Sequence, residues 1–385
     1  MKNNFKILCL ILTLILLLLF PEPVITSTKT GLFIWADKVI PSLFPFFVLT
    51  RLMIHYQVPQ LIGIILSPLF KHILHISPIT FFIMLMSVIS GNPAGAKMAR
   101  EYYDQKLISK REFQGLLYFC NFSSPLFILG TIGVILYQSS QVGYLLLASH
   151  LLGSLVVFIC CYPYLKNKNS EHELRIKQPM QDFSAILIDS IESTIQTLIR
   201  VGGIIMFFYI VSAVFNILTV FESLNLLLAP VLLFSNISTL EPLFSGILEF
   251  TQGVSKIAEA DIPLNLQLAM TAFVVSFVGL SIHTQIFMFA KDSGISYLKY
   301  LMFRVMHGWA SALIVLFGWR FFLTDVQDVF LPESILPYGG VVEWTFYSFP
   351  MITVGFMGIY FLLKFKVSCN NLNIRKFRPN KNHSL

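Results

Sequence analysis

Polar residues interrupt the apolar segments of this 385-residue chain at four places, and their types and spacing could bind a ligand. At the first place Gly91, Pro93 and Gly95 lie close together, which ends a helix and lets a ligand or another backbone approach. Asn92 adds an amide side chain. A half-helix starting after this break would favour an anion by roughly 0.3–1 kcal/mol, or up to about 2 kcal/mol when partly buried. We predict a binding site at this break.

A simple surface turn is the alternative interpretation of this break. The segment Asn-Pro-Ala-Gly-Ala-Lys is small and polar, which favours a site over a turn that faces lipid. Lys97 ends the segment, and it could lend its charge to an anionic substrate or anchor the chain near the membrane surface. The anchor needs no further role and is preferred for Lys97.

The second place comprises Asn121, Ser123 and Ser124, eight to eleven residues inside an apolar span that begins at Phe113. Pro125 removes a helical hydrogen bond and disfavours helix at the residue before it. Hydroxyl, amide and freed carbonyl groups therefore meet at one depth, which suits a small polar solute or a cation. Hydrogen bonding between neighbouring helices is the alternative role.

The third place is Glu249, a carboxylate within an apolar segment. A charge at the centre of a bilayer costs on the order of 2.5–3.5 kcal/mol even on a lenient insertion scale. We therefore expect Glu249 to face a cavity or to be protonated, and to serve a coupled proton or cation or to accept a hydrogen bond from substrate. Pairing with Arg200 or Arg304 is the structural alternative.

The fourth place is the group Ser281, His283, Thr284 and Gln285 in a later apolar segment. A single buried histidine is more often a packed, hydrogen-bonded residue than a ligand. Four polar positions so close together leave binding and packing as equal alternatives.

The elements that must position these residues are membrane helices. Hydrophobic residues make up 56% of the chain and charged residues 12%, and the mean hydropathy is +0.74, which excludes an ordinary globular enzyme. Apolar blocks recur from Ile7 to Leu363 and leave no room for a soluble domain. We predict an all-α polytopic membrane protein.

Motifs of enzymes and metal sites are missing from the sequence. It has no phosphate-binding loop, no GxSxG, no HExxH and no CxxC among its five cysteines. We therefore expect no enzymatic activity, no metal and no cofactor beyond a coupled proton or cation. The net charge of +7 comes from basic residues beside apolar blocks, which indicates membrane topology rather than nucleic-acid binding. The expected partners are a small-molecule substrate and the lipid bilayer, and a homo-oligomer is left open.

Charges in the connections predict which side each segment faces. Five basic residues lie in residues 97–111, four in 166–177 and six in the tail from residue 364, whereas residues 324–343 carry four acids and no base. The basic segments are predicted to be cytoplasmic and the acidic segment external. About eight spans fit this pattern, near residues 5–25, 33–55, 113–137, 141–165, 200–220, 264–290, 299–323 and 344–364.

Two further apolar blocks are predicted to enter the membrane without crossing it. Residues 78–98 and 237–258 are each interrupted by Gly, Pro or a carboxylate. Non-helical backbone at membrane depth is tolerated only inside protein or beside a polar cavity, so two such re-entrant hairpins predict a site between them. Residues 182–200 have an apolar and a charged face and are predicted to lie on the membrane surface.

The two halves of the chain follow one plan. An offset of 158 residues places Gly95 on Gly253 and Ser123 on Ser281 without a gap. Each half contains a span, a broken hairpin, a polar turn and an interrupted span, and the two hairpins would open to opposite sides. Such an inverted repeat is the plan of many secondary transporters, whose substrate site lies near the midplane between the broken helices.

A family resemblance rests on the segments SGNPAGAK at 90–97 and CNFSSPLFILG at 120–130, and it extends through residues 31–49 and 248–253. These segments resemble the sporulation integral membrane proteins of the YlbJ type. That family carries the nucleoside-recognition, or Gate, domain, which is shared with the gates of ferrous iron transporter B and is similar to the repeats of concentrative nucleoside transporters.

The resemblance implies roles for particular residues. The Asn-Phe-Ser-Ser stretch at 121–124 matches a nucleoside-binding motif, and Glu249 matches a second-hairpin carboxylate that binds ribose. The first hairpin departs from the nucleoside transporters, because Asn92 and Pro93 stand where those proteins have an acidic, glutamine-rich tip. The implied substrate-binding residues are Asn92, Gly95, Asn121, Ser123, Ser124, Glu249, Thr251, Gln252, Ser281 and Thr284.

For the sporulation family itself, the resemblance implies export of dipicolinate from the mother cell across the outer forespore membrane, in support of the spore core and cortex. We therefore expect a transporter or channel for a small anionic metabolite. The alternatives are transport of a nucleoside or related heterocycle, and a non-transporting assembly role in spore formation.

These expectations divide the chain into seven parts. They are an N-terminal membrane anchor (1–25), a first Gate-like repeat (26–165), a cytoplasmic linker (166–182), a second Gate-like repeat (183–323), an external acidic loop (324–343), a last membrane helix (344–364) and a basic cytoplasmic tail (365–385).

Overall fold

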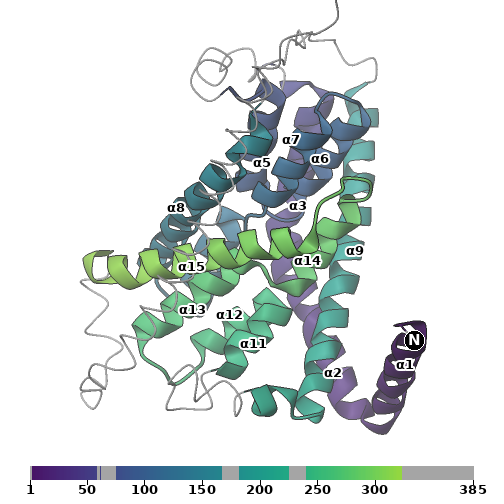
Figure 1. Cartoon of the computed structure of the whole chain (residues 1–385), viewed down its shortest axis with the longest axis vertical. Coiled ribbons are helices and arrows are strands. Elements are labelled where there is room, and N and C mark those ends of the chain that lie inside the picture. Colours follow the sequence, from purple (N-terminus) through teal and green to yellow (C-terminus); the bar gives the residue numbers. More distant parts are fainter. Residues whose placement is uncertain (1, 59–60, 62–74, 167–181, 225–239, 323–385) are drawn as a thin grey trace, which may run out of the picture.

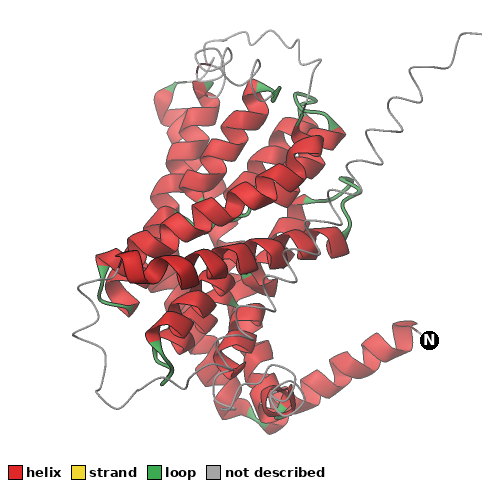
Figure 2. Ribbon diagram, turned by 60° about the vertical axis from the view of Figure 1, so that its left-hand side comes forward, coloured by secondary structure: helices red, strands yellow, loops and turns green. Residues whose placement is uncertain are grey.

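The computed structural model describes residues 2–58, 61, 75–166, 182–224 and 240–322 (Figure 1). Within these ranges the chain is helical and has no strand, apart from one isolated bridge between Ile76 and Lys166 (Figure 2). The predicted all-α class is therefore confirmed. The predicted external loop, last membrane helix and basic tail lie outside the described residues, as does most of the linker at 166–182.

Several described helices can cross a bilayer by length and composition. Four are long and apolar enough, and a bent N-terminal pair makes up to five. The four are Ser140–Leu165, Phe183–Ile217, Leu264–Phe289 and Tyr297–Trp319. These helices support a multi-pass membrane protein, while the count of about eight spans stays a prediction.

The N-terminal segment differs from the spans predicted at 5–25 and 33–55. α1 (Lys2–Leu19) ends before Pro21, and α2 (Pro21–Ile34) bends away from it by 99°, so that α1 projects from the bundle (Figure 2). A π-helical turn, η1 (Trp35–Val39), then joins α2 directly to α3 (Ile40–His55). The break falls at residue 20 because Pro21 has no N–H to continue α1, although it fits the first turn of a new helix.

The first set of elements begins with a helical hairpin. α5 (Pro78–Ser90) packs against α6 (Ala94–Asp104), and α8 (Ser140–Leu165) closes the set as one long helix. Between them the span predicted at 113–137 is broken into α7 (Lys110–Phe119) and a π-helix, η3 (Phe127–Leu136). Ser77 caps α5 through Thr80 N at 3.2 Å, and Ser109 and Glu112 form a capping box on α7.

Helix α9 (Phe183–Ile217) connects the two halves and packs along α2 and α3. It is one 35-residue helix, so residues 182–200 are not the separate surface connector that their charged face predicted. No proline interrupts the segment, and Asp189, Glu192 and Gln196 on its charged face are exposed. Asp189 contacts Arg51 and His55 on α3. Trp35 fixes the crossing with α2, because its ring packs on Gly202 and its Nε1 donates to Leu198 O at 2.9 Å.

The second set of elements has the same order as the first. α11 (Leu240–Leu248) and α12 (Phe250–Ala258) form a hairpin, α13 (Leu264–Phe277) and α14 (Gly279–Phe289) form a broken helix, and α15 (Tyr297–Phe322) is long and continuous. In Figure 1, α5, α6 and α7 lie at the top, α11 and α12 lie below, and α15 runs between them.

The two long helices meet in the middle of the molecule. α8 packs on α15. A Cβ atom at Gly153 would lie only 3.1 Å from the backbone N of Ser311. One turn away, the rings of His150 and His307 stack at 4.7 Å between centroids. A residue larger than glycine at position 153 would separate these helices.

The polar and apolar surfaces are distributed as in a membrane protein. Arg304 and Glu249 are fully buried, whereas Leu155 on α8 and Phe207 on α9 are more than half exposed. Exposed aliphatic residues continue along the outer faces of these helices, among them Leu152, Ile159, Ile195 and Ile199. Burying charge while exposing leucine is unfavourable in water and suits a surface covered by lipid.

Candidate functional site

A cavity lies where the tip of the first hairpin meets the broken helices. Its walls come from η1, α3, the α5–α6 hairpin, the segment between α7 and η3, α9, α12 and α14. The lining residues are Val39, Leu43, Asn92, Ser123, Ser124, Phe127, Val201, Ile205, Phe250, Ile282 and Gln285. Apolar walls with a few convergent polar groups are typical of small-molecule sites.

The first hairpin tip lies directly on the break in the following helix. Residues 120–124 are not helical, and Asn92 N donates to Phe122 O at 2.7 Å. Gly91 has φ +76°, and a Cβ at this position would lie 2.7 Å from Ser124 N. Only glycine fits such a close approach at a positive φ, which explains why the tip reaches the cavity.

Asn121 and Arg304 hold this non-helical segment in place. Arg304 donates to Asn121 O at 3.1 Å and to Tyr118 O at 2.7 Å, which satisfies carbonyl groups freed by the break. The Asn121 amide donates to Leu117 O at 2.8 Å and accepts from Tyr300 at 2.9 Å. Asn121 is therefore occupied by protein groups, as in the interhelical alternative.

Ser123 and the paired histidines connect this segment to the second half. Ser123 Oγ donates to Val275 O at 3.0 Å, and Ser123 N donates to Nε2 of His150 at 3.3 Å. His150 Nδ1 lies 2.8 Å from Ser276 Oγ, whose hydroxyl is in turn 2.8 Å from Ser311 Oγ. Nε2 of His307 lies 2.9 Å from the backbone oxygen of His150. Hydrogen bonds thus connect the segment that carries Ser123 to α8 and α13, and they connect these two helices to α15.

Glu249 forms the tip of the second hairpin. Its carboxylate caps α12 by accepting from Gln252 N at 2.8 Å and from the Thr251 hydroxyl, and Ser281 Oγ lies 3.5 Å away. In the described part of the chain it forms an ion pair with neither Arg200 nor Arg304, and its partners are groups of Thr251, Gln252 and Ser281.

The second hairpin also meets a helix break. Val278 and Gly279 have φ values of +66° and +62°, and a Cβ on Gly279 would lie 3.0 Å from Phe250 N. Phe250, the residue after Glu249, lines the cavity. Both hairpin tips therefore contact a broken helix, and both reach the same cavity.

Two residues that line this cavity carry buried polar atoms without a hydrogen-bond partner. Asn92 Oδ1 and both amide atoms of Gln285 are buried and have no hydrogen-bond partner, although both residues line the cavity. Gln252 Oε1 is also buried and unpaired at the second hairpin. Most buried polar groups in proteins are paired, so these groups are available to a ligand.

The ten predicted site residues lie in different surroundings. Asn92, Ser123 and Ser124 line the cavity, and Thr251, Gln252 and Ser281 surround Glu249. Gly95 packs between Ser87 and Cys120, and Asn121 is occupied as described above. Thr284 is exposed and donates to Leu280 O at 2.9 Å.

Gln285 belongs to the site although the predicted binding set names its neighbour Thr284 instead. Helical spacing could have indicated this, because Gln285 lies four residues after Ser281 and three after Ile282, on the buried face of α14. Among the described residues no group of His, Cys, Asp and Glu is placed to hold a metal ion. The arrangement suits a polar solute that both donates and accepts hydrogen bonds.

Comparisons with known proteins agree with the resemblance in the sequence. No family model matches the chain, and no solved structure matches it. The chain is similar to the sporulation integral membrane protein YlbJ of Bacillus subtilis (strain 168), with 29% identity over 330 residues, which cover 80% of this chain and 80% of that protein. This similarity, together with the apolar outer surface of the helical bundle, supports a multi-pass integral membrane protein that is similar to the YlbJ type.

Proposed function

We propose that this protein is a transporter or channel that moves a small anionic metabolite during sporulation. Dipicolinate is the first candidate substrate, and the outer forespore membrane is the proposed location. The observation that carries the proposal is the pair of unpaired amide side chains, Asn92 and Gln285, on a cavity between two helix breaks. Leaving a buried polar group unpaired costs about 1–3 kcal/mol, and a ligand carboxylate that accepts from Gln285 Nε2 would recover this free energy at that atom. Asn92 Oδ1 is an acceptor, so it would pair with a protonated carboxyl group of the ligand.

Positive charge beside the cavity supports an anionic substrate. Arg304 is fully buried and forms no salt bridge with a carboxylate in the described residues. Its guanidinium binds the backbone of the segment that continues into Ser123 and Ser124. Helices also begin at Ala94 and Pro125, close to Asn92 and Ser124, so two positive helix ends lie beside the cavity.

The shared order of the two sets of elements supports a transporter over a static scaffold. α8 and α15 begin at Ser140 and Tyr297, an offset close to that of Gly95 and Gly253. In an inverted repeat, two such sets rock around a fixed site between the hairpin tips. Glu249 would then carry a coupled proton or cation from its position at the second tip.

A neutral heterocycle such as a nucleoside is the second candidate substrate. Among the described lining residues the cavity has no charged side chain, and the two amides could pair with both donors and acceptors on a base. An assembly factor without transport activity has no need of unpaired amides.

Uptake by proteoliposomes tests the proposal. The purified full chain should accumulate radiolabelled dipicolinate above the level of protein-free liposomes under an imposed proton or sodium gradient, and uridine should compete weakly. Asn92→Ala should reduce uptake, whereas Thr284→Val, on the exposed face of α14, should not. Uptake of uridine but not dipicolinate would favour the second candidate, and uptake of neither would contradict transport.

A further inference from the structure

A second cavity lies between α3, α6 and α9, next to the central one. It is lined by Phe47, Thr50, Arg51, Ile54, Ala94, Lys97, Met98, Glu101 and Thr194. Phe47 is one turn from Leu43 on α3, and Ala94 is two residues from Asn92, so the two cavities follow each other along the same elements.

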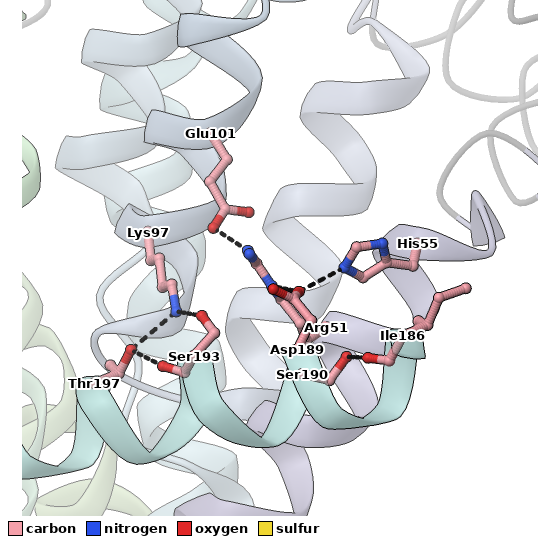
Figure 3. Close-up of polar contacts among 9 residues, drawn as sticks. All are labelled: Arg51, His55, Lys97, Glu101, Ile186, Asp189, Ser190, Ser193 and Thr197. Atoms are coloured by element: carbon pink, nitrogen blue, oxygen red, sulfur yellow. Dashed lines mark hydrogen bonds and ion pairs between the residues drawn. The ribbon is translucent and has the colours of Figure 1, made fainter. Parts of the chain in front are cut away.

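The hydrogen-bond partners of Lys97 in this cavity are neutral hydroxyl groups. Its Nζ donates to Ser193 Oγ at 3.1 Å and to Thr197 Oγ1 at 2.9 Å, and both hydroxyls belong to α9 (Figure 3). The Thr197 hydroxyl donates to Ser193 O at 2.8 Å, which turns its lone pairs toward Lys97. In the described residues no carboxylate forms a salt bridge with Lys97. Its ammonium points across to α9, unlike an anchor that reaches for the membrane surface.

Arg51 is the second cation of this cavity, and the carboxylates nearest to it belong to Glu101 and Asp189. Nη1 of Arg51 lies 2.5 Å from Glu101 Oε1, and Nε lies 3.7 Å from Asp189 Oδ2 without a hydrogen bond. Asp189 also lies 3.1 Å from Nε2 of His55 (Figure 3). These contacts join α3 to α6 and α9, and both Arg51 and Glu101 are only 25% exposed.

We propose that Lys97 and Arg51 form a second anion-binding site, which takes a small dicarboxylate before it reaches the central cavity. One carboxylate of the ligand would bind the remaining donor of Lys97, and the other would displace Glu101 from Arg51. A planar guanidinium binds carboxylates well, and an ammonium with neutral partners gains most from an anion. This inference rests on the proposed transport of an anionic metabolite.

Equilibrium binding to the purified full chain tests this site separately from transport. Titration calorimetry with dipicolinate, at low ionic strength and without divalent cations, should reveal two binding events in the wild type. Lys97→Gln should weaken one of them about tenfold, because a charge-assisted hydrogen bond is lost. Lys97→Arg should restore much of it, and Lys110→Gln, an exposed lysine on α7, should leave both unchanged.

The sign of a second variant separates ligand binding from a structural ion pair. Glu101→Gln removes the carboxylate that competes for Arg51, so it should strengthen the same binding event by a few-fold. If the ion pair between Arg51 and Glu101 has only a structural role, Glu101→Gln should instead weaken dipicolinate binding or lower the abundance of folded protein.

The two proposals can fail separately. If Lys97→Gln and Glu101→Gln leave both binding events unchanged while Asn92→Ala abolishes one, the second site is wrong and the central site stands. Absence of any dipicolinate binding to the wild type would overturn both.

Discussion

At the scale of single residues, the cavity depends on which amides are paired and which are not. Asn121 and Asn92 are both asparagines next to a helix break, yet Asn121 is held by Tyr300 and the backbone while Asn92 Oδ1 has no partner. The sequence predicted polar groups at both breaks. It could not predict this difference, because Tyr300, which donates to the Asn121 amide oxygen, lies 179 residues away in the chain.

Gln285→Met should have opposite effects on stability and on transport. Removing an amide that is unpaired and fully buried should raise the free energy of unfolding by about 1–3 kcal/mol, since no hydrogen bond is lost. The same change should reduce dipicolinate uptake. Thermal unfolding in detergent and proteoliposome uptake measure the two effects, and a fall in stability would indicate that Gln285 is a structural residue.

Glu249→Gln separates the two substrate classes. A dianion beside an ionised carboxylate would be repelled by about 4 kcal/mol at 4 Å and an effective dielectric of 20, so Glu249 must be neutralised when dipicolinate is bound. Glutamine keeps an oxygen that can cap α12 through Gln252 N. We therefore expect the variant to bind dipicolinate but to lose the dependence of transport on pH or cation.

A neutral nucleoside predicts a different result, because an ionised Glu249 would be a strong acceptor for its hydroxyl groups. Glu249→Gln would then weaken binding at every pH. Glu241→Gln, which alters the hairpin's ion pair with Lys256, serves as the control. A Glu249→Gln variant that equals the wild type in binding, transport and pH profile would leave Glu249 with a purely structural role.

At the scale of elements, glycine, proline and polar residues within apolar blocks predicted the breaks correctly. The hairpins end in breaks at Gly91 and Glu249, and the following helices break at residues 120–124 and 278. The bend at Phe20 and the uninterrupted α9 were not predicted. The bend follows from Pro21, which cannot continue α1. The course of α9 depends on tertiary packing, since Asp189 contacts His55 on α3 and Ser193 contacts Lys97 on α6.

Gly95→Ala tests whether the first hairpin must pack this closely. A Cβ at position 95 would lie 2.7 Å from Ser87 Cβ and 2.9 Å from Cys120 Cβ, so the hairpin would move away from the broken helix. Overpacking of this kind costs about 1–3 kcal/mol, and we expect most transport activity to be lost at normal membrane abundance. Gly203→Ala, which meets no atom within 4 Å, is the matched control and should transport normally.

At the scale of the whole molecule, composition alone predicted a helical membrane protein, and the apolar exterior agrees with it. The orientation of the two hairpins remains a prediction from charge. Figure 1 places the turn after α6 and the turn after α12 at opposite ends of the bundle, as the predicted inverted repeat requires.

Single cysteines at Lys106 and Asp261, both exposed in these turns, test that orientation. In proteoliposomes of known orientation, made from a variant without native cysteines, a membrane-impermeant maleimide should label position 106 only from the cytoplasmic face and position 261 only from the opposite face. Labelling of both positions from one face would contradict the inverted repeat.

The central claim is that a substrate passes through the cavity beside Asn92 and Gln285, and a cysteine in place of Ser124 tests it most directly. Ser124 lines this cavity and is only 3% exposed, so a water-soluble thiol reagent can reach it only through the cavity. We predict that Ser124→Cys, in proteoliposomes of known orientation, reacts with the reagent from either face and that dipicolinate slows both reactions. Reaction from neither face, or reaction that dipicolinate leaves unchanged, would contradict transport through this cavity.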